Sequence, residues 1–274
     1  MRKRILNVLW RGVRCLLIAY LVVLLLMMML ERHLIYFPSV YPEGEWNAEA
    51  IGAEDAFFEA ADGVKLHGWY VEHPQPRAHV LFLHGNAGNL THRDEMLVQW
   101  RDQRRCSVFI VDYRGYGRSE GAPSEAGVLA DGRAARAWLA QRAGIAEEQV
   151  VLLGRSLGGG VAVDMAAADG ARAVILESTF TSLPDIAARS FPFLPVRLLM
   201  RNRLDSLSKI GDYHGPLLQS HSVDDEVIPY DLGARLFEAA NEPKQFIEMQ
   251  GRGHNDRPTR EYKQALDAFL DSLP

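Results

Sequence analysis

The chain has 274 residues, of which 48% are hydrophobic and 24% charged, as in an ordinary globular protein, and this excludes disordered and fibrous classes. Its formal net charge is −5, yet residues 1–30 carry five positive side chains and no acid, so the remainder carries 25 basic and 35 acidic side chains. An acidic domain lacks the basic footprint of a nucleic-acid-binding protein. Cys15 lies in an apolar run far from Cys106, which excludes a disulfide or zinc framework.

Residues 13–33 are predicted to form a membrane-spanning helix. Residues 15–30 are sixteen uncharged, mostly apolar residues, and with Arg14 snorkelling the segment approaches the roughly 17–25 residues that cross a bilayer as a helix. A cleaved signal peptide begins similarly, but here the run ends in Met and Leu without the small residues of a cleavage site. A buried core helix, the other alternative, is rarely so uniformly apolar behind five positive charges. We therefore expect an uncleaved signal anchor.

The charge pattern also predicts a topology. The basic segment, residues 1–12, should stay in the cytoplasm, which places the rest of a single-pass protein on the periplasmic or lumenal side. Residues 34–55 contain Pro38, Pro42 and Gly44 and are expected to form a linker whose first residues lie at the membrane interface. The folded domain is expected over residues 56–274.

Strands and helices are predicted to alternate along this domain. Strand-like segments cover residues 56–59, 65–71, 79–83, 106–111, 149–153, 173–177, 216–219 and 244–249, and helix-like segments cover residues 91–101, 124–142, 157–168, 231–240 and 258–273. The middle strands are continuous apolar runs, which is typical of parallel strands covered by helices on both faces. Two opening strands followed by β-α repeats predict a mostly parallel, eight-stranded α/β sheet with an antiparallel edge.

Residues 180–210 interrupt the alternation. They are too many for an ordinary loop between a strand and a helix, so we expect a small lid insertion. Its apolar residues Phe191, Phe193, Leu198 and Leu199 either line a substrate pocket or pack on the sheet, and the sequence leaves both readings open.

Ser156 is the predicted nucleophile. The run Gly-Arg-Ser-Leu-Gly at residues 154–158 matches G-x-S-x-G, follows an apolar strand and precedes a helix of small residues. At a sharp strand-to-helix turn, glycines on both sides remove Cβ atoms that would clash and leave the serine Oγ exposed. The alternative is a glycine-rich turn with an inert serine, which leaves this placement unexplained.

A serine hydroxyl becomes nucleophilic when a histidine takes its proton and a carboxylate orients that histidine. His254 follows the strand at residues 244–249 in a Gly-x-Gly loop and is the predicted base. Asp224, Asp225 and Glu226 are adjacent after the strand at residues 216–219. Asp225 is the preferred acid, and Asp224 would then cap or satisfy the turn.

An oxyanion hole is expected beside the serine. Residues 84–89, His-Gly-Asn-Ala-Gly-Asn, follow the strand at residues 79–83. The backbone N–H groups of Asn86 and Leu157 should converge on the developing negative charge, where one such donor contributes roughly 3–4 kcal/mol. A phosphate-cradling turn is the alternative, but no Lys-Ser/Thr pair follows.

Five motifs in this order resemble a branch of the α/β-hydrolase superfamily over residues 34–273. They are HGNAGN at residues 84–89, DYRGYGRSEG at 112–121, the GxSxGG elbow at 154–159, ESTFTS at 177–182 and GxGHND at 251–256. The branch includes membrane-associated acyl-protein thioesterases and lies near serine aminopeptidases. The resemblance implies the α/β-hydrolase fold with Ser156, Asp225 and His254 as a triad. The chain departs from it at His221-Ser222, where relatives often have Gly, and lacks the thioesterases' Cys-rich N-terminus.

Together these features predict a membrane-anchored serine hydrolase of acyl esters or thioesters that uses no metal or cofactor. Its expected partners are the membrane and an acyl substrate, which is a small molecule, a lipid or an acylated protein. A peptidase of the same fold is the alternative, although no carboxylate for a substrate ammonium is identifiable outside the acid loop. A non-enzymatic membrane scaffold is the third reading.

Overall fold

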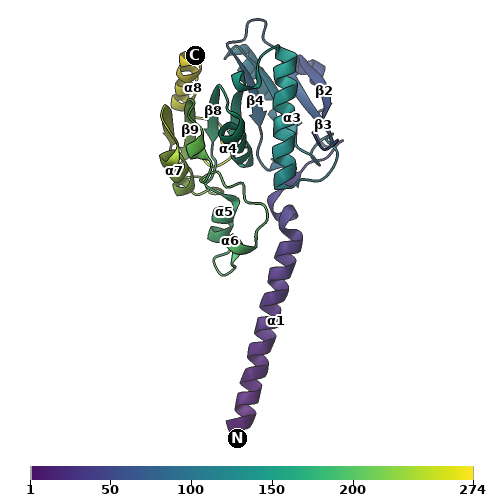
Figure 1. Cartoon of the computed structure of the whole chain (residues 1–274), viewed down its shortest axis with the longest axis vertical. Coiled ribbons are helices and arrows are strands. Elements are labelled where there is room, and N and C mark those ends of the chain that lie inside the picture. The colour runs from purple at the N-terminus through teal and green to yellow at the C-terminus, as the bar shows by residue number, and fades with distance from the viewer. Residues whose placement is uncertain (1, 274) are drawn as a thin grey trace.

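An eight-stranded sheet forms the centre of the domain in the computed structural model, which describes residues 2–273 (Figure 1). The strands lie in the order β10-β9-β8-β7-β4-β6-β3-β2. β3 pairs antiparallel with β2 and β6, and the other neighbours pair in parallel, which confirms the predicted sheet with its antiparallel edge. The strands are β2 (Ala53–Glu59), β3 (Lys65–Val71), β4 (Ala78–Leu83), β6 (Cys106–Asp112), β7 (Val151–Arg155), β8 (Ala173–Glu177), β9 (Leu217–Ser222) and β10 (Lys244–Met249).

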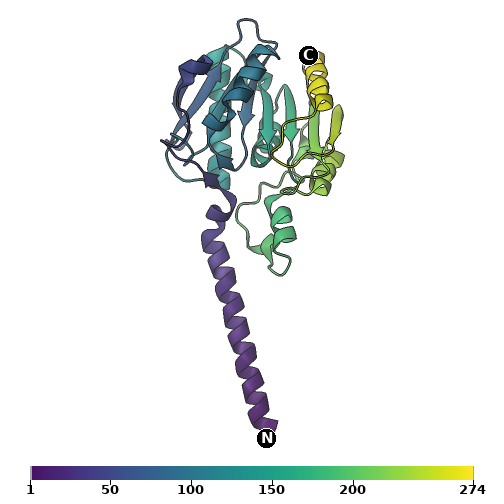
Figure 2. The same ribbon diagram turned by 180° about the vertical axis from the view of Figure 1, so that it is seen from behind.

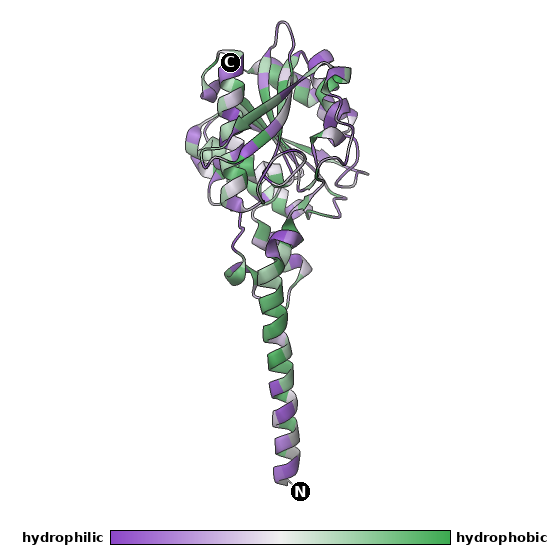
Figure 3. Ribbon diagram, turned by 90° about the vertical axis from the view of Figure 1, so that its right-hand side faces the viewer, coloured by the Kyte–Doolittle hydropathy of each residue, from purple (hydrophilic) through white to green (hydrophobic). Residues whose placement is uncertain are grey.

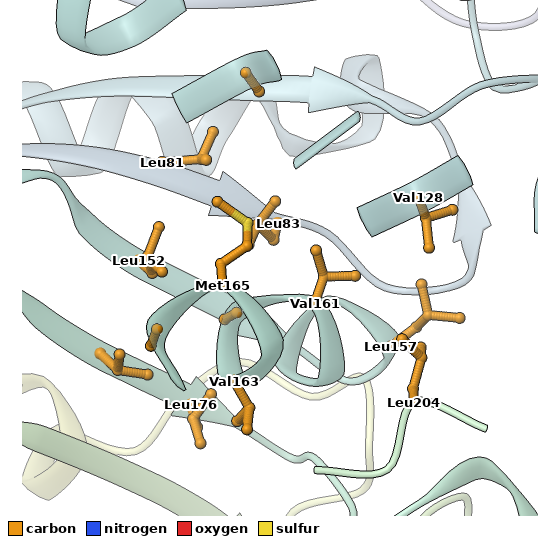
Figure 4. Close-up of a cluster of buried hydrophobic side chains, with 14 of the residues drawn as sticks. Leu81, Leu83, Val128, Leu152, Leu157, Val161, Val163, Met165, Leu176 and Leu204 are labelled. Atoms are coloured by element: carbon orange, nitrogen blue, oxygen red, sulfur yellow. The ribbon is translucent and has the colours of Figure 1, made fainter. Parts of the chain in front are cut away.

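Helices cover both faces of this sheet, as predicted. α3 (Glu125–Ala143), α4 (Leu157–Asp169) and α7 (Tyr230–Ala239) pack on one face, and α2 (Asp94–Asp102) and α8 (Arg260–Ser272) pack on the other. Successive residues of a central strand point to opposite faces, so Leu81 belongs to the same hydrophobic cluster as Met165 of α4 (Figure 4). Val80 belongs to the cluster on the other face. This double burial explains why the central strands are apolar throughout rather than alternating.

Among the predicted element starts that differ from the structure, those at residues 149 and 258 have clear local reasons. Residue 149, expected in a strand, lies in a 3-10 turn over Glu147–Gln149, so β7 begins at Val151. Pro258, expected in the first turn of the last helix, precedes it. The hydroxyl of Thr259 accepts a hydrogen bond from the backbone N–H of Tyr262, and this N-cap starts α8 at Arg260.

The N-terminal helix α1 (Arg2–Ile35) projects from the domain (Figures 1 and 2). Its portion Leu9–Ile35 is long and apolar enough to cross a membrane, and an apolar 18-residue stretch within it has no residue buried by the rest of the described chain, whereas Glu31 near its end is buried. Figure 3 shows that its hydrophilic residues gather near the N-terminus and its hydrophobic ones nearer the domain. A signal sequence shares this length and composition.

Residues 34–55, expected as a linker, are held against the domain. The helix continues to Ile35, and β1 (Phe37–Pro38) then pairs in parallel with β5 (Ala87–Gly88) in the predicted oxyanion loop. Val40 forms a further bridge to Gly117, and β2 already begins at Ala53. The end of α1 is therefore joined directly to the loop beside the candidate nucleophile.

The insertion at residues 180–210 contains two short helices, α5 (Leu183–Ser190) and α6 (Val196–Leu199). The Ser182 hydroxyl accepts a hydrogen bond from the backbone N–H of Asp185, which caps α5, and Pro184 suits its first turn. Both helices project from the domain beside the end of α1 (Figures 1 and 2). We call residues 180–210 the lid insertion.

Candidate active site

Ser156 stands at a sharp turn between β7 and α4, as predicted from the flanking glycines. Its backbone has φ 54° and ψ −119°, a conformation that side-chain-bearing residues rarely adopt. A Cβ on Gly158 would lie 1.9 Å from the carbonyl oxygen of Leu83, and one on Gly154 would lie 2.5 Å from the carbonyl oxygen of Gly158. The turn therefore requires glycine at both positions, and it exposes the serine Oγ to the adjoining cavity.

The structure brings the three predicted side chains together from loops after β7, β9 and β10. Ser156 Oγ lies 3.2 Å from His254 Nε2, and His254 Nδ1 lies 2.7 Å from Asp225 Oδ2. An ionised carboxylate only accepts hydrogen bonds, so Nδ1 carries the proton and Nε2 has a free lone pair toward the serine hydroxyl. This is the tautomer in which His254 accepts the proton of Ser156.

Each of the three adjacent acids has a different partner in the histidine loop. Asp225 meets the imidazole of His254, Asp224 Oδ2 accepts from the backbone N–H of Gly251 at 2.6 Å, and Glu226 Oε2 accepts from that of His254 at 3.0 Å. Asp224 therefore holds the facing loop rather than capping its own turn. All three acids fix the position of His254, but only Asp225 contacts its ring.

His221 is a neighbour of this acid that the sequence did not identify. It is fully buried, its Nε2 donates to the carbonyl oxygen of Ile228 at 2.9 Å, and the same nitrogen lies 3.4 Å from Asp225 Oδ2. Burial alone would raise the pKa of Asp225, but hydrogen bonds from His221, His254 and the backbone of Ile228 bring it well below its usual range. Asp225 is thus ionised at neutral pH. The one signal in the sequence was histidine at a position where relatives often have glycine.

The predicted oxyanion loop lies directly beside the nucleophile. A Cβ on Gly85 would be 3.5 Å from Ser156 Cβ, and Asn86 lines the same cavity as Ser156. Leu157 is the first residue of α4, so its N–H is one of the helix's orphan donors. The convergence of the Asn86 and Leu157 N–H groups on one substrate oxygen stays a prediction.

The end of α1 supports this loop. The Asn86 side chain donates to the carbonyl oxygen of Ile35 at 2.9 Å, and the Asn86 carbonyl oxygen accepts from the backbone N–H of Phe37 at 2.9 Å and the hydroxyl of Tyr116 at 2.7 Å. The side chain and the carbonyl group of Asn86 are therefore both held by hydrogen bonds. Two of the three partners, Ile35 and Phe37, lie at the end of α1 or just after it.

His84, in the same loop, is a structural residue. Its Nδ1 donates to the carbonyl oxygen of Gly85 at 2.7 Å, as expected for a hydrogen bond within the loop. Burial lowers the pKa of His84 to about 3 and raises that of the neighbouring Asp112 to about 8, and their side chains are 3.7 Å apart. Both groups are therefore neutral at pH 7, and a histidine with so low a pKa is too weak a base to take the proton of Ser156.

An apolar cavity of about 240 Å³ opens beside Ser156. The lid insertion contributes Phe191 and Leu199 to its lining, whereas Phe193 and Leu198 lie outside it and are 88% and 85% exposed. The sequence did not predict that α1 forms another wall, through Leu24, Met27, Met28, Glu31, Leu34 and Ile35. Within residues 2–273, no cluster of three or more His, Cys, Asp or Glu side chains is arranged to hold a metal ion.

Comparisons with known proteins agree with this architecture. A family model described as serine aminopeptidase, S33, matches residues 74–209. The chain is 37% identical to the Mycobacterium tuberculosis protein Rv2307c, covering 87% of this chain and 85% of that one. It is 34% identical to the Arabidopsis thaliana α/β-hydrolase domain-containing protein WAV2, covering 74% and 72%. The Pyrococcus furiosus esterase Pf2001 superimposes with a TM-score of 0.71 over 87% of this chain and 99% of that one, at 19% identity, and so shares the fold.

Proposed function

Since the chain belongs to the α/β-hydrolase superfamily, we propose that it is a serine hydrolase cleaving ester or thioester bonds of acyl substrates. The observation that carries the proposal is the hydrogen-bonded series Ser156–His254–Asp225 beside an apolar cavity that Ser156 lines. An acyl chain fits such a cavity, because its lining offers hydrophobic contact and few polar groups.

In the first half of the reaction, Ser156 Oγ attacks the carbonyl carbon of the substrate while His254 Nε2 takes the hydroxyl proton. Asp225 stabilises the imidazolium that forms, which is why a carboxylate with a lowered pKa suits this position. The backbone N–H groups of Leu157 and Asn86 bind the tetrahedral oxygen. His254 then protonates the leaving alcohol or thiol, and an acyl-serine remains.

In the second half, water replaces the leaving group. His254 takes a proton from the water, the hydroxide attacks the acyl-serine, and the carboxylic acid departs as Ser156 regains its proton. The buried site, in which Ser156 and His254 are 8% and 7% exposed, strengthens these electrostatic interactions.

A peptidase is the second candidate, because the matching family model describes a serine aminopeptidase. Among the residues that the structure describes, Glu31 is the only charged side chain lining the cavity, and a carboxylate there could attract a substrate ammonium. Its Oε1, however, already accepts hydrogen bonds from the backbone N–H groups of Arg201 and Asn202 and from the Asn202 side chain. These donors compensate its charge, so the apolar lining favours an acyl group.

We also propose that α1 is an uncleaved anchor, with residues 1–12 in the cytoplasm and the domain on the periplasmic or lumenal side. The basic N-terminus and the contacts of Ile35 and Phe37 with the oxyanion loop support this, because cleavage would remove part of the packed structure. An N-terminal epitope tag should be retained in the mature membrane protein. Its loss, or protease digestion of the domain from the cytoplasmic side, would contradict the assignment.

Active-site labelling of the full-length protein tests the catalytic proposal. A fluorophosphonate should label the wild type and the surface control Ser208→Ala, but not Ser156→Ala. The wild type should hydrolyse acyl esters or thioesters faster than aminoacyl arylamides. Labelling that persists in Ser156→Ala would refute the nucleophile, and preferential cleavage of the arylamides would favour the peptidase.

A further inference from the structure

The wall that α1 contributes to the cavity belongs to the same helix that is apolar enough to cross a membrane. One helical face of α1 carries the residues Leu24, Met27, Met28, Glu31 and Ile35, of which Glu31 is buried and the other four are half-buried. Their neighbours on other faces are open, with Leu25 57%, Leu26 50% and Met29 69% exposed. One face of α1 therefore belongs to the active site, and the others are free to contact lipid.

The lid insertion forms the facing wall. Leu183 and Ile186 of α5, Phe191, and Leu199 of α6 line the cavity opposite α1. Ser156 and Asn86 lie at its inner end. The cavity is therefore a passage between a membrane-type helix and an apolar lid, with the nucleophile where the passage meets the sheet.

The depth of this passage can be measured along α1. Glu31 ends the uncharged stretch at residues 15–30, and Leu24 lies seven residues further in, or about 10 Å at 1.5 Å per residue. One leaflet of hydrocarbon is about 15 Å thick. With α1 in a bilayer, Leu24 would lie about two thirds of the way from the leaflet surface to the midplane, and the outer part of the cavity would be at the depth of the acyl chains.

The tip of the lid insertion reaches at least as deep as Leu24. The hydroxyl of Tyr20, within the uncharged stretch, donates a hydrogen bond to the carbonyl oxygen of Phe193 at 3.0 Å. The side chains of Phe193 and Leu198 are 88% and 85% exposed, an arrangement that is costly in water but favourable against lipid. At the level of Glu31, Arg32 and Arg201 are exposed, where they would meet lipid phosphates.

We propose that a membrane phospholipid is the substrate, and that its acyl chain enters the cavity sideways from the bilayer between α1 and the lid insertion. This rests on the proposed serine-hydrolase function. The ester carbonyl is attacked by Ser156, the bond to the glycerol oxygen breaks, and His254 protonates that oxygen to release a lysophospholipid. Water then cleaves the acyl-serine to give a fatty acid.

The test uses the full-length protein in vesicles of dioleoyl phosphatidylglycerol, with fatty-acid release compared with hydrolysis of soluble p-nitrophenyl butyrate. Met28→Trp narrows the passage, and Met29→Trp places the same ring on an exposed face of α1. Since a change of one methylene in an apolar pocket alters discrimination about tenfold or more, Met28→Trp should lower the ratio of lipid to butyrate turnover by at least about tenfold. Met29→Trp should leave that ratio unchanged. Fluorophosphonate labelling of Ser156 reports whether each variant is folded.

Three results would overturn the inference. The first is butyrate turnover without fatty-acid release from the vesicles. The second is an equal effect of Met28→Trp and Met29→Trp on the ratio. The third is cleavage of an S-palmitoyl peptide in vesicles whose phospholipid stays intact. Failure of the catalytic proposal itself is distinguishable, because butyrate hydrolysis would then persist in Ser156→Ala.

Discussion

Replacing Asp225 by Asn probes the geometry of the candidate triad most directly. Asp225 Oδ1 accepts hydrogen bonds from the backbone N–H groups of Val227 at 2.9 Å and Ile228 at 2.7 Å, while Oδ2 faces His254 Nδ1. In the variant, the amide oxygen must occupy the Oδ1 site, because an NH₂ group there would point at two donors. The NH₂ group therefore faces the histidine ring.

Nδ1 of His254 then has to accept a hydrogen bond, which moves the ring proton to Nε2. That proton points at Ser156 Oγ, 3.2 Å away, so the histidine no longer takes the serine proton. The same change in the serine-protease triad lowers kcat about 10⁴-fold, and we expect a similar loss here. At 1.36 kcal/mol per tenfold, this amounts to about 5 kcal/mol of transition-state stabilisation.

The neighbouring acids supply matched controls. Asp224→Asn and Glu226→Gln keep an oxygen for the backbone N–H groups of Gly251 and His254, so kcat should stay within about threefold of wild type. Steady-state hydrolysis of p-nitrophenyl butyrate gives kcat and KM for each variant, and thermal unfolding verifies the fold. The reasoning is refuted if Asp225→Asn loses less than about tenfold, or if Asp224→Asn loses more than Asp225→Asn.

Three further predictions follow from buried polar contacts. Removing the ring of His221, 3.4 Å from Asp225, should lower kcat about tenfold with little change in KM, and an unchanged kcat would make this histidine purely structural. Glu31→Ala leaves three hydrogen-bond donors without their acceptor and should reduce the free energy of unfolding by about 2–4 kcal/mol. Glu31→Gln keeps an acceptor oxygen and should be less destabilised. Equal melting temperatures for the two variants would contradict this prediction. Asp112 keeps its proton in the folded chain up to about pH 8 but ionises near about pH 4 in the unfolded chain, so the free energy of unfolding should fall as pH rises between these values. Melting curves of Asp112→Asn should lack this fall, and a parallel pH dependence in both proteins would disprove it.

Much of the architecture followed from local patterns in the sequence. Apolar runs located the strands, because a central strand buried on both faces has no polar position to offer. The glycines around Ser156 predicted its turn, since a Cβ at residue 158 has no room beside the backbone of Leu83. The order of serine, acid and histidine along the chain predicted that these groups meet at one edge of the sheet, and the structure brings them within hydrogen-bond distance.

The direction in which a side chain points was harder to predict than the place of its residue in the fold. Asp224, Asp225 and Glu226 are chemically alike and adjacent, so which of them faces the imidazole depends on the turn and the loop opposite. The same holds for the lid insertion, where Phe191 points into the cavity and Phe193 points away. Composition cannot separate such pairs, because both members are equally acidic or equally apolar.

By itself, the sequence determined an apolar N-terminal helix, a parallel sheet and a serine at a strand-to-helix turn, because each leaves a local pattern of residue types along the chain. Only the tertiary structure decided that the same N-terminal helix walls the cavity and supports the oxyanion loop, with Met28 beside the passage and Ile35 bonded to Asn86. An apolar face looks the same in a sequence whether lipid or a lid covers it. Contacts between residues far apart in the chain distinguish the two.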